Sequence, residues 1–231
     1  MPTPYLHDDL FKINPDLKLS EYHIECVGDI LIIDDFYMYP DTIEEMLNDS
    51  WVLPWKYKKN SRNTKDYFDC RLANKLSHTE DIEFENQRFL RNKIFDFFKI
   101  KTKDTTLSPT FNIFKWEIRG ISSKYQMYPH KDNSNEIAST IYLDSKHSGG
   151  TAFYTVKESS KGQEILKENY DIKVDVDKYY DFHECIEGIF NRCIIYPGHY
   201  LHGGYIDDHD FYTDNWRKNQ VYFFEKETCT N

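Results

Sequence analysis

The sequence has no long apolar run and no regular set of cysteines. Its five cysteines are widely spaced and include no Cys-x-x-Cys pair, which argues against a disulfide scaffold and against a structural zinc site. No apolar run approaches the roughly 18 residues that a membrane-spanning helix needs. The first twelve residues also lack the apolar segment of a signal peptide. We therefore expect a reducing, cytoplasmic location and no membrane partner.

Basic residues are in deficit as well, because 29 Lys and Arg stand against 39 Asp and Glu, for a formal net charge of −10. A chain of this charge is repelled by nucleic-acid phosphates, so we do not expect nucleic acid as a partner. One basic run, between Lys56 and Lys65, fits a solvated loop better than a nucleic-acid site. It is compatible with a small anionic substrate or an acidic partner.

Aromatic residues, in contrast, are abundant, with 18 Tyr and 16 Phe. Disordered chains lack the large apolar side chains that offset the entropy of ordering, so this chain is expected to fold. Aromatic enrichment also favours strands. With 231 residues, we expect a single domain over residues 1–231 with one substantial core.

The first half of the chain predicts supporting elements, over about residues 21–105. Residues 24–36 are β-rich and predict a strand pair or one long strand, whereas residues 1–20 predict a peripheral arm and 54–80 a loop. A helix is expected to begin near Pro40, and the best helix pattern covers 86–100. The apolar faces of these two helices are Ile43, Met46 and Leu47 in the first, and Phe89, Leu90, Ile94, Phe97 and Phe98 in the second.

From Thr110 onward, short β runs alternate with turns, as in a sandwich or jelly roll. Strands are expected at 111–118, 124–128, 136–143, 151–156, 192–196, 203–206 and 220–224, with a polar insertion at 157–181. The predicted fold is mainly β: a double-stranded β-helix (jelly roll) with flanking N-terminal helices and a core over about residues 110–225.

A His-x-Asp pair, His130 and Asp132, lies within this β region. Alternate residues of a strand share a face, so both side chains could bind one ion. His7 and Asp9 show the same spacing, but they lie in the expected arm. A second histidine, His202, follows a strand and a Pro-Gly turn. Two histidines and one carboxylate that leave positions open are the ligands of non-haem Fe(II) oxygenases.

The order of these motifs resembles that of the 2-oxoglutarate/Fe(II)-dependent dioxygenases, and in particular their prolyl-4-hydroxylase-like branch. The resemblance covers about residues 110–224. Its motifs are His130-Lys131-Asp132, Tyr142-Leu143-Asp144, Gly149-Gly150-Thr151-Ala152-Phe153, Tyr196-Pro197-Gly198, His202 and a later basic residue.

This resemblance implies catalytic metal ligands and a site for the cosubstrate. The ligands would be His130, Asp132 and His202, with His199 as a rival for the last. Arg217 would pair with the distal carboxylate of 2-oxoglutarate, because a guanidinium meets a carboxylate through two hydrogen bonds. Lys218 is its rival, because the interval from the last histidine is longer than usual in the family. Tyr142 and Asn219 would add contacts to the same carboxylate.

The resemblance further implies an enzyme, a dioxygenase that uses Fe(II), 2-oxoglutarate and O2, with ascorbate as an accessory reductant. It would hydroxylate an unidentified protein side chain or small molecule. Segments 55–72 and 157–182 are the expected lids over that substrate. Two other functions remain open: a cupin-like metal-binding hydrolase or isomerase, and a non-catalytic β-sandwich binding module.

Overall fold

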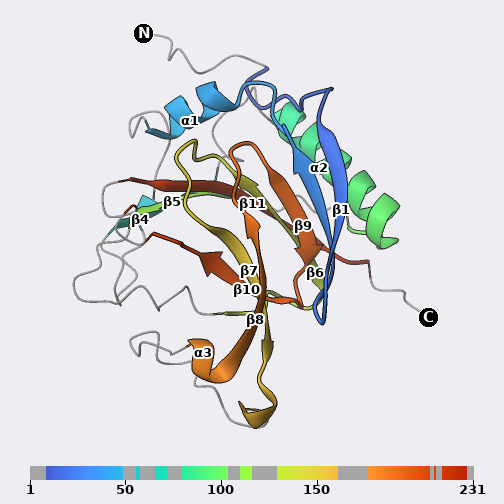
Figure 1. Ribbon diagram of the computed structural model, residues 1–231. Coiled ribbons are helices and arrows are strands. Elements are labelled where there is room, and N and C mark those ends of the chain that lie inside the picture. Colours follow the sequence, from blue (N-terminus) through green and yellow to red (C-terminus); the bar gives the residue numbers. More distant parts are fainter. Residues whose placement is uncertain are drawn as a thin grey trace.

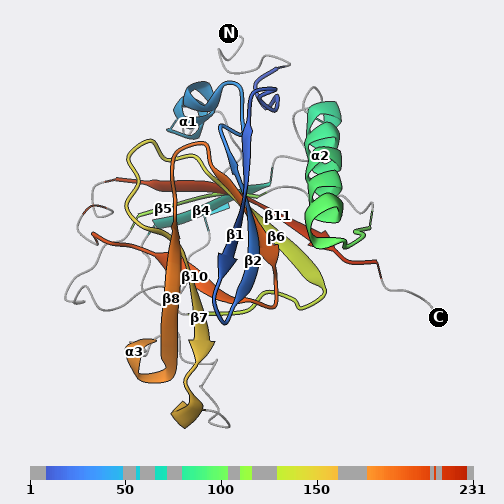
Figure 2. The same ribbon diagram turned by 45° about the vertical axis from the view of Figure 1, so that its right-hand side comes forward.

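The computed structural model describes residues 9–48, 56–57, 66–71, 80–103, 110–115, 129–160, 176–208, 211 and 215–227. Two antiparallel sheets form its body (Figures 1 and 2). Within the described residues, the larger sheet has eight strands in the order β1-β2-β9-β6-β11-β5-β4-β3, and the smaller has three in the order β10-β7-β8.

The strands of the larger sheet are β1 (Lys18–Ile24), β2 (Gly28–Asp34), β3 (Lys56–Tyr57), β4 (Asp66–Arg71), β5 (Thr110–Lys115), β6 (Glu136–Tyr142), β9 (Cys193–Pro197) and β11 (Arg217–Glu225). Those of the smaller sheet are β7 (Gly150–Val156), β8 (Tyr180–Glu187) and β10 (Leu201–Tyr205). This arrangement confirms the predicted mainly-β jelly roll.

One face of the larger sheet packs against two helices, α1 (Pro40–Asn48) and α2 (Glu80–Phe98). The cluster on this face joins Met46 of α1 and Ile94 of α2 to Ile141 of β6 and Tyr222 of β11. All four are at most 2% exposed. Burial of large apolar side chains from both helices and several strands holds this layer together.

The other face of the larger sheet packs against the smaller sheet. Because successive strand residues point to opposite faces, Ala138 and Tyr142 of β6 face inward while Ile141 faces the helices. Phe153 of β7 and Ile186 of β8 meet them from the smaller sheet. This inner layer, between the two sheets, is where the candidate site lies.

The shorter helical elements lie at the far end of the smaller sheet, where α3 (Val176–Tyr179) leads into β8 and a 3-10 turn (Glu158–Ser160) follows β7 (Figure 1). Among the described helices, none is long and apolar enough to cross a membrane.

Both predicted helices are confirmed. The apolar face Ile43, Met46 and Leu47 is buried in α1. In α2, Leu90 and Ile94 are fully buried. This helix begins at Glu80 rather than at residue 86. The apolar stripe used to predict it does not extend into its first turns, and so the earlier start was missed.

Three predicted irregular regions are wrong in part. Residues 54–80, predicted as a loop, contain strands β3 and β4. The polar insertion predicted at 157–181 contains α3 and the start of β8. The expected arm at 1–20 includes Leu10 and Phe11, which are 2% and 1% exposed in the main core. It also includes the first residues of β1. The strand predicted at 124–128 and residues 58–65 of the basic run lie outside the described residues.

Candidate metal centre

His130, Asp132 and His202 converge on one point at the edge of the inner layer. One ligand atom from each lies within 4.8 Å of the other two. Asp132 Oδ1 is 3.8 Å from His130 Nε2, and its Oδ2 is 3.4 Å from His202 Nε2. The two histidines are paired through the backbone, because each N–H donates to the other's carbonyl, at 2.8 and 2.9 Å. A short β bridge therefore sets the distance between the two imidazoles.

The imidazole of His202 is oriented for metal binding. Its Nδ1 lies 2.9 Å from the carbonyl of Tyr200, which can only accept, so Nδ1 carries the proton. The lone pair of Nε2 is then left facing Asp132. Burial and the neighbouring His130 lower the pKa of His202 to about 4, so the ring is neutral at pH 7. A neutral imidazole is the form that binds a metal.

Asp132 is also held in a poorly solvated position. Burial raises the pKa of its carboxyl group, and the charge of Glu136 adds to this, although His130 acts in the opposite direction. An unpaired carboxylate in such a place is unfavourable. A bound cation would supply the missing positive charge and would favour the ionised form.

The donor set fits an open metal site. Ligand nitrogens lie about 2.0–2.1 Å from such an ion, so atoms separated by 3.4–3.8 Å need only small shifts to share one. His202 is 7% exposed and His130 is 47% exposed, so the site has one buried and one open side. Among the described residues no fourth ligand joins the group. His199, the predicted rival, is exposed and stacks its ring edge on Tyr200 instead.

Two aromatic residues to which the sequence analysis assigned no role in the site lie beside His202. The ring of Tyr196 lies 4.8 Å from the imidazole, and that of Phe153 lies 6.4 Å from it. Phe153 is the β7 residue paired with His202 in the sheet. Burial raises the pKa of Tyr196, with contributions from Asp132 and Tyr142. Tyr196 therefore packs against His202 and shares the inner cluster with Tyr142.

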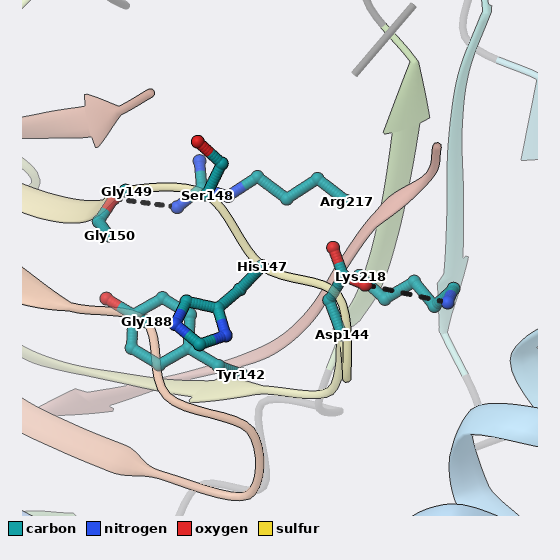
Figure 3. A pocket seen from close by; sticks show the side chains of 9 residues that line it. All are labelled: Tyr142, Asp144, His147, Ser148, Gly149, Gly150, Gly188, Arg217 and Lys218. Atoms are coloured by element: carbon teal, nitrogen blue, oxygen red, sulfur yellow. Dashed lines mark hydrogen bonds and ion pairs between the residues drawn. The ribbon is translucent and has the colours of Figure 1, made fainter. Parts of the chain in front are cut away.

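That second half is a small pocket lined by Arg217 and Tyr142 (Figure 3). Arg217 is 5% exposed and its Nη2 donates to the carbonyl of Gly150 at 2.8 Å. The hydroxyls of Tyr142 and Thr151 lie 2.6 Å apart. Asn219 pairs with Tyr142 across the sheet, and its Oδ1 is buried without a hydrogen-bond partner among the described residues. The pocket thus offers a guanidinium and a phenol, and the amide of Asn219 lies on the same sheet face beside Tyr142.

Lys218, the rival of Arg217, reaches the rim of this pocket but is already paired. Its Nζ lies 2.5 Å from Glu44 Oε1 of α1 and 3.8 Å from Asp144 Oδ1, the second of which is drawn in Figure 3. Burial raises the pKa of Glu44, but the hydrogen bonds and charge from Lys218 and Ser145 outweigh it and lower that pKa below its ordinary value. The structure therefore brings the three predicted ligands together and places Tyr142, Arg217 and Asn219 in one neighbouring cluster.

Comparison with known families and structures gives a family of undefined activity and a well-defined fold. The profile of a family of unknown function (DUF6445) matches residues 15–174, well over half of the chain. None of the curated proteins has a matching sequence.

Among solved structures, HygX from Streptomyces hygroscopicus, with nickel, 2-oxoglutarate and hygromycin B bound, has a TM-score of 0.55 at 12% identity; the match covers 85% of this chain and 82% of that one. The carbocyclase SnoK from nogalamycin biosynthesis, a non-haem 2-oxoglutarate-dependent enzyme, has a TM-score of 0.52 at 8% identity, over 85% and 79%. A prolyl hydroxylase from Trichoplax adhaerens, in complex with a peptide of hypoxia inducible factor, has a TM-score of 0.50 at 11% identity, over 85% and 83%. The chain shares the fold of these enzymes.

Proposed function

The chain belongs to the family of unknown function DUF6445, and from this premise we propose that it is a 2-oxoglutarate- and Fe(II)-dependent dioxygenase. The observation that carries the proposal is the cluster of His130, Asp132 and His202 on the inner layer of a jelly roll. Two imidazoles and a carboxylate on one side of an ion leave its other side open, which is the ligand set of non-haem Fe(II) oxygenases. The fold shared with such enzymes supports it.

Arg217 is proposed as the partner of the distal carboxylate of 2-oxoglutarate. It lies on the inner face, next to Tyr142, whereas Lys218 points towards α1 and pairs with Glu44. A buried guanidinium binds a carboxylate through charge-assisted hydrogen bonds. The hydroxyl of Tyr142 can donate to the same carboxylate while it accepts from Thr151, and the amide of Asn219 lies on the same face.

Each protein group then has a defined part in the reaction. His130, Asp132 and His202 would hold the ion at the edge of the inner layer, and Arg217 would fix the far end of the cosubstrate. Tyr196 and Phe153 exclude water beside the buried histidine. Bound Fe(II) would supply the oxidative chemistry, in which 2-oxoglutarate and O2 give succinate and CO2 and one oxygen atom enters the substrate.

We further propose that the chain is one domain and that its prime substrate is a protein side chain or a small molecule. The single-domain proposal is supported by the main core, which joins Leu10 near one end of the described chain to Phe224 near the other. The open side of the site, next to the half-exposed His130, is where a substrate would approach.

Turnover without a prime substrate tests the proposed function. Purified protein supplied with Fe(II), ascorbate and 2-oxoglutarate should release succinate slowly. Asp132→Ala should abolish this release because it removes the only carboxylate of the ligand set. His183→Ala is the matched control, since His183 lies in β8, where its ring pairs with the hydroxyl of Thr155, and it is not one of the clustered residues.

A cupin-like zinc enzyme or a binding module would give another result. Neither would release succinate, and neither would be stabilised by N-oxalylglycine, a mimic of 2-oxoglutarate, in a thermal-shift measurement. Absence of both signals from the iron-loaded wild-type protein would exclude the dioxygenase.

A further inference from the structure

The tip of the β1–β2 hairpin contacts the loop that carries His202. Tyr200 lies in this loop, two residues before the histidine, and its backbone N–H donates to the carbonyl of Pro197 at 3.0 Å. Its hydroxyl accepts a hydrogen bond from the backbone N–H of Asp29, at the start of β2. The ring also packs on the inner cluster, to which Val27 of the hairpin turn belongs as well. Tyr200 is therefore held by the hairpin and by its own loop.

Gly28 makes this contact possible. A Cβ at this position would lie 2.1 Å from the hydroxyl oxygen of Tyr200 and 2.7 Å from Cζ of its ring. Gly28 also has a φ of +136°, which L-residues with a side chain rarely adopt. The hairpin can therefore lie against Tyr200 only because residue 28 has no side chain.

The backbone of Tyr200 is in turn bound to the metal ligand. Its carbonyl accepts the Nδ1 proton of His202 at 2.9 Å, which leaves Nε2 of the imidazole 3.4 Å from Asp132. The ring of Tyr196 contacts the same imidazole, with 4.8 Å between the ring centres. Movement of the Tyr200 carbonyl would change the direction of the Nε2 lone pair.

We propose that the β1–β2 hairpin, acting through Tyr200, positions His202 for metal binding. Tyr200 is a positioning residue, because it holds a metal ligand without belonging to the ligand set. The inference rests on the proposed function only in taking His130, Asp132 and His202 as a metal site. Removal of a group that orients a metal ligand lowers metal affinity by about 10- to 100-fold.

The test measures Co(II) binding by the metal-free protein, through its dissociation constant and the absorption bands of the bound ion. Tyr200→Ala should weaken binding, by up to about 10- to 100-fold, and change the bands, because the carbonyl that orients the imidazole is no longer anchored by the ring. Tyr200→Phe keeps the ring and should have a smaller effect. Leu19→Ser is the matched control on the same hairpin, since Leu19 is 46% exposed, and it should bind Co(II) like the wild type. Thermal unfolding of each metal-free variant separates loss of fold from loss of affinity.

A second substitution tests whether the hairpin acts through Tyr200. Gly28→Ala should weaken Co(II) binding by displacing the tyrosine ring. Combined with Tyr200→Ala, it should add less loss than it causes alone, because the collision with the ring is gone and only the backbone strain at φ +136° remains. If Tyr200→Ala does not fold, Tyr200→Phe and Gly28→Ala carry the comparison.

Folded variants at Tyr200 and Gly28 that bind Co(II) with the wild-type constant and bands would overturn the inference, and so would losses that simply add. Failure of the wild-type protein itself to bind Co(II) would instead refute the metal site on which the proposed function depends.

Discussion

Replacing Arg217 and Lys218 one at a time by Met should separate the function of the pocket from the stability of the fold. Arg217 is 5% exposed and faces the inner layer. A hydrogen bond to a charged group contributes about 1.5–3 kcal/mol. Arg217→Met should therefore raise the half-saturating concentration of 2-oxoglutarate by about 10- to 150-fold, because 1.4 kcal/mol corresponds to a factor of ten.

Lys218→Met should act on stability instead. Lys218 and Glu44 are 8% and 13% exposed, so the substitution leaves a carboxylate buried without its cation. Removing one partner of such a pair costs about 3–5 kcal/mol. Glu44 keeps a hydrogen bond from the N–H of Ser145 at 3.2 Å, so we expect the lower end of this range. About 3 kcal/mol corresponds to a fall of roughly 6–12 °C in Tm for a protein of this size.

The assay combines succinate release, titrated with 2-oxoglutarate, and thermal unfolding of both variants. Arg217→Met should change the cosubstrate requirement, whereas Lys218→Met should change Tm with little change in the cosubstrate requirement. The reverse pattern would show that Lys218, and not Arg217, binds the distal carboxylate of 2-oxoglutarate.

Three further predictions concern single residues. Tyr142→Phe should raise the half-saturating 2-oxoglutarate concentration roughly fivefold, the equivalent of about 1 kcal/mol; an unchanged value in the same titration would exclude its hydroxyl from the contact. Gly150→Ala should strongly lower Tm, because the added Cβ would lie 2.0 Å from the carbonyl oxygen of Ile186 and would push β7 and β8 apart; a wild-type Tm would contradict this. Glu44 has a lowered pKa in the folded protein, so its contribution to stability is present at neutral pH and is lost as the pH falls through that pKa. Urea unfolding at pH 7 and at about pH 4 should show an acid-induced loss that is smaller in Lys218→Met, and equal losses would count against the pair.

The elements that could be predicted from the sequence are those with a buried apolar face. α1 and α2 were found through such faces, as were most strands after Thr110. β1 was missed as a separate strand because six of its seven residues are exposed, so it has no apolar alternation to detect. β8 was hidden in a similar way, since Asp181, Phe182 and Glu187 are exposed within it.

The candidate site shows the same division between local and long-range information. The His-x-Asp pair is visible because both residues lie within three positions of the chain. The surroundings of His202 could not be predicted in the same way: Phe153 reaches it through the pairing of β10 with β7, and Gly28 supports it from the hairpin. The choice between Arg217 and Lys218 likewise depends on which face of β11 is inward, and the pairing of Asn219 with Tyr142 supplies that information.

The backbone bridge between residues 130 and 202 has a consequence for synthesis of the chain. A ribosome completes His130 and Asp132 long before it reaches His202, so a nascent chain holds only part of the ligand set until β10 has emerged and paired. Capture of an ion by the proposed metal site would therefore follow closure of the two sheets rather than initiate it. The chain should therefore fold in the absence of iron, unlike a zinc finger, which folds only when it binds its metal.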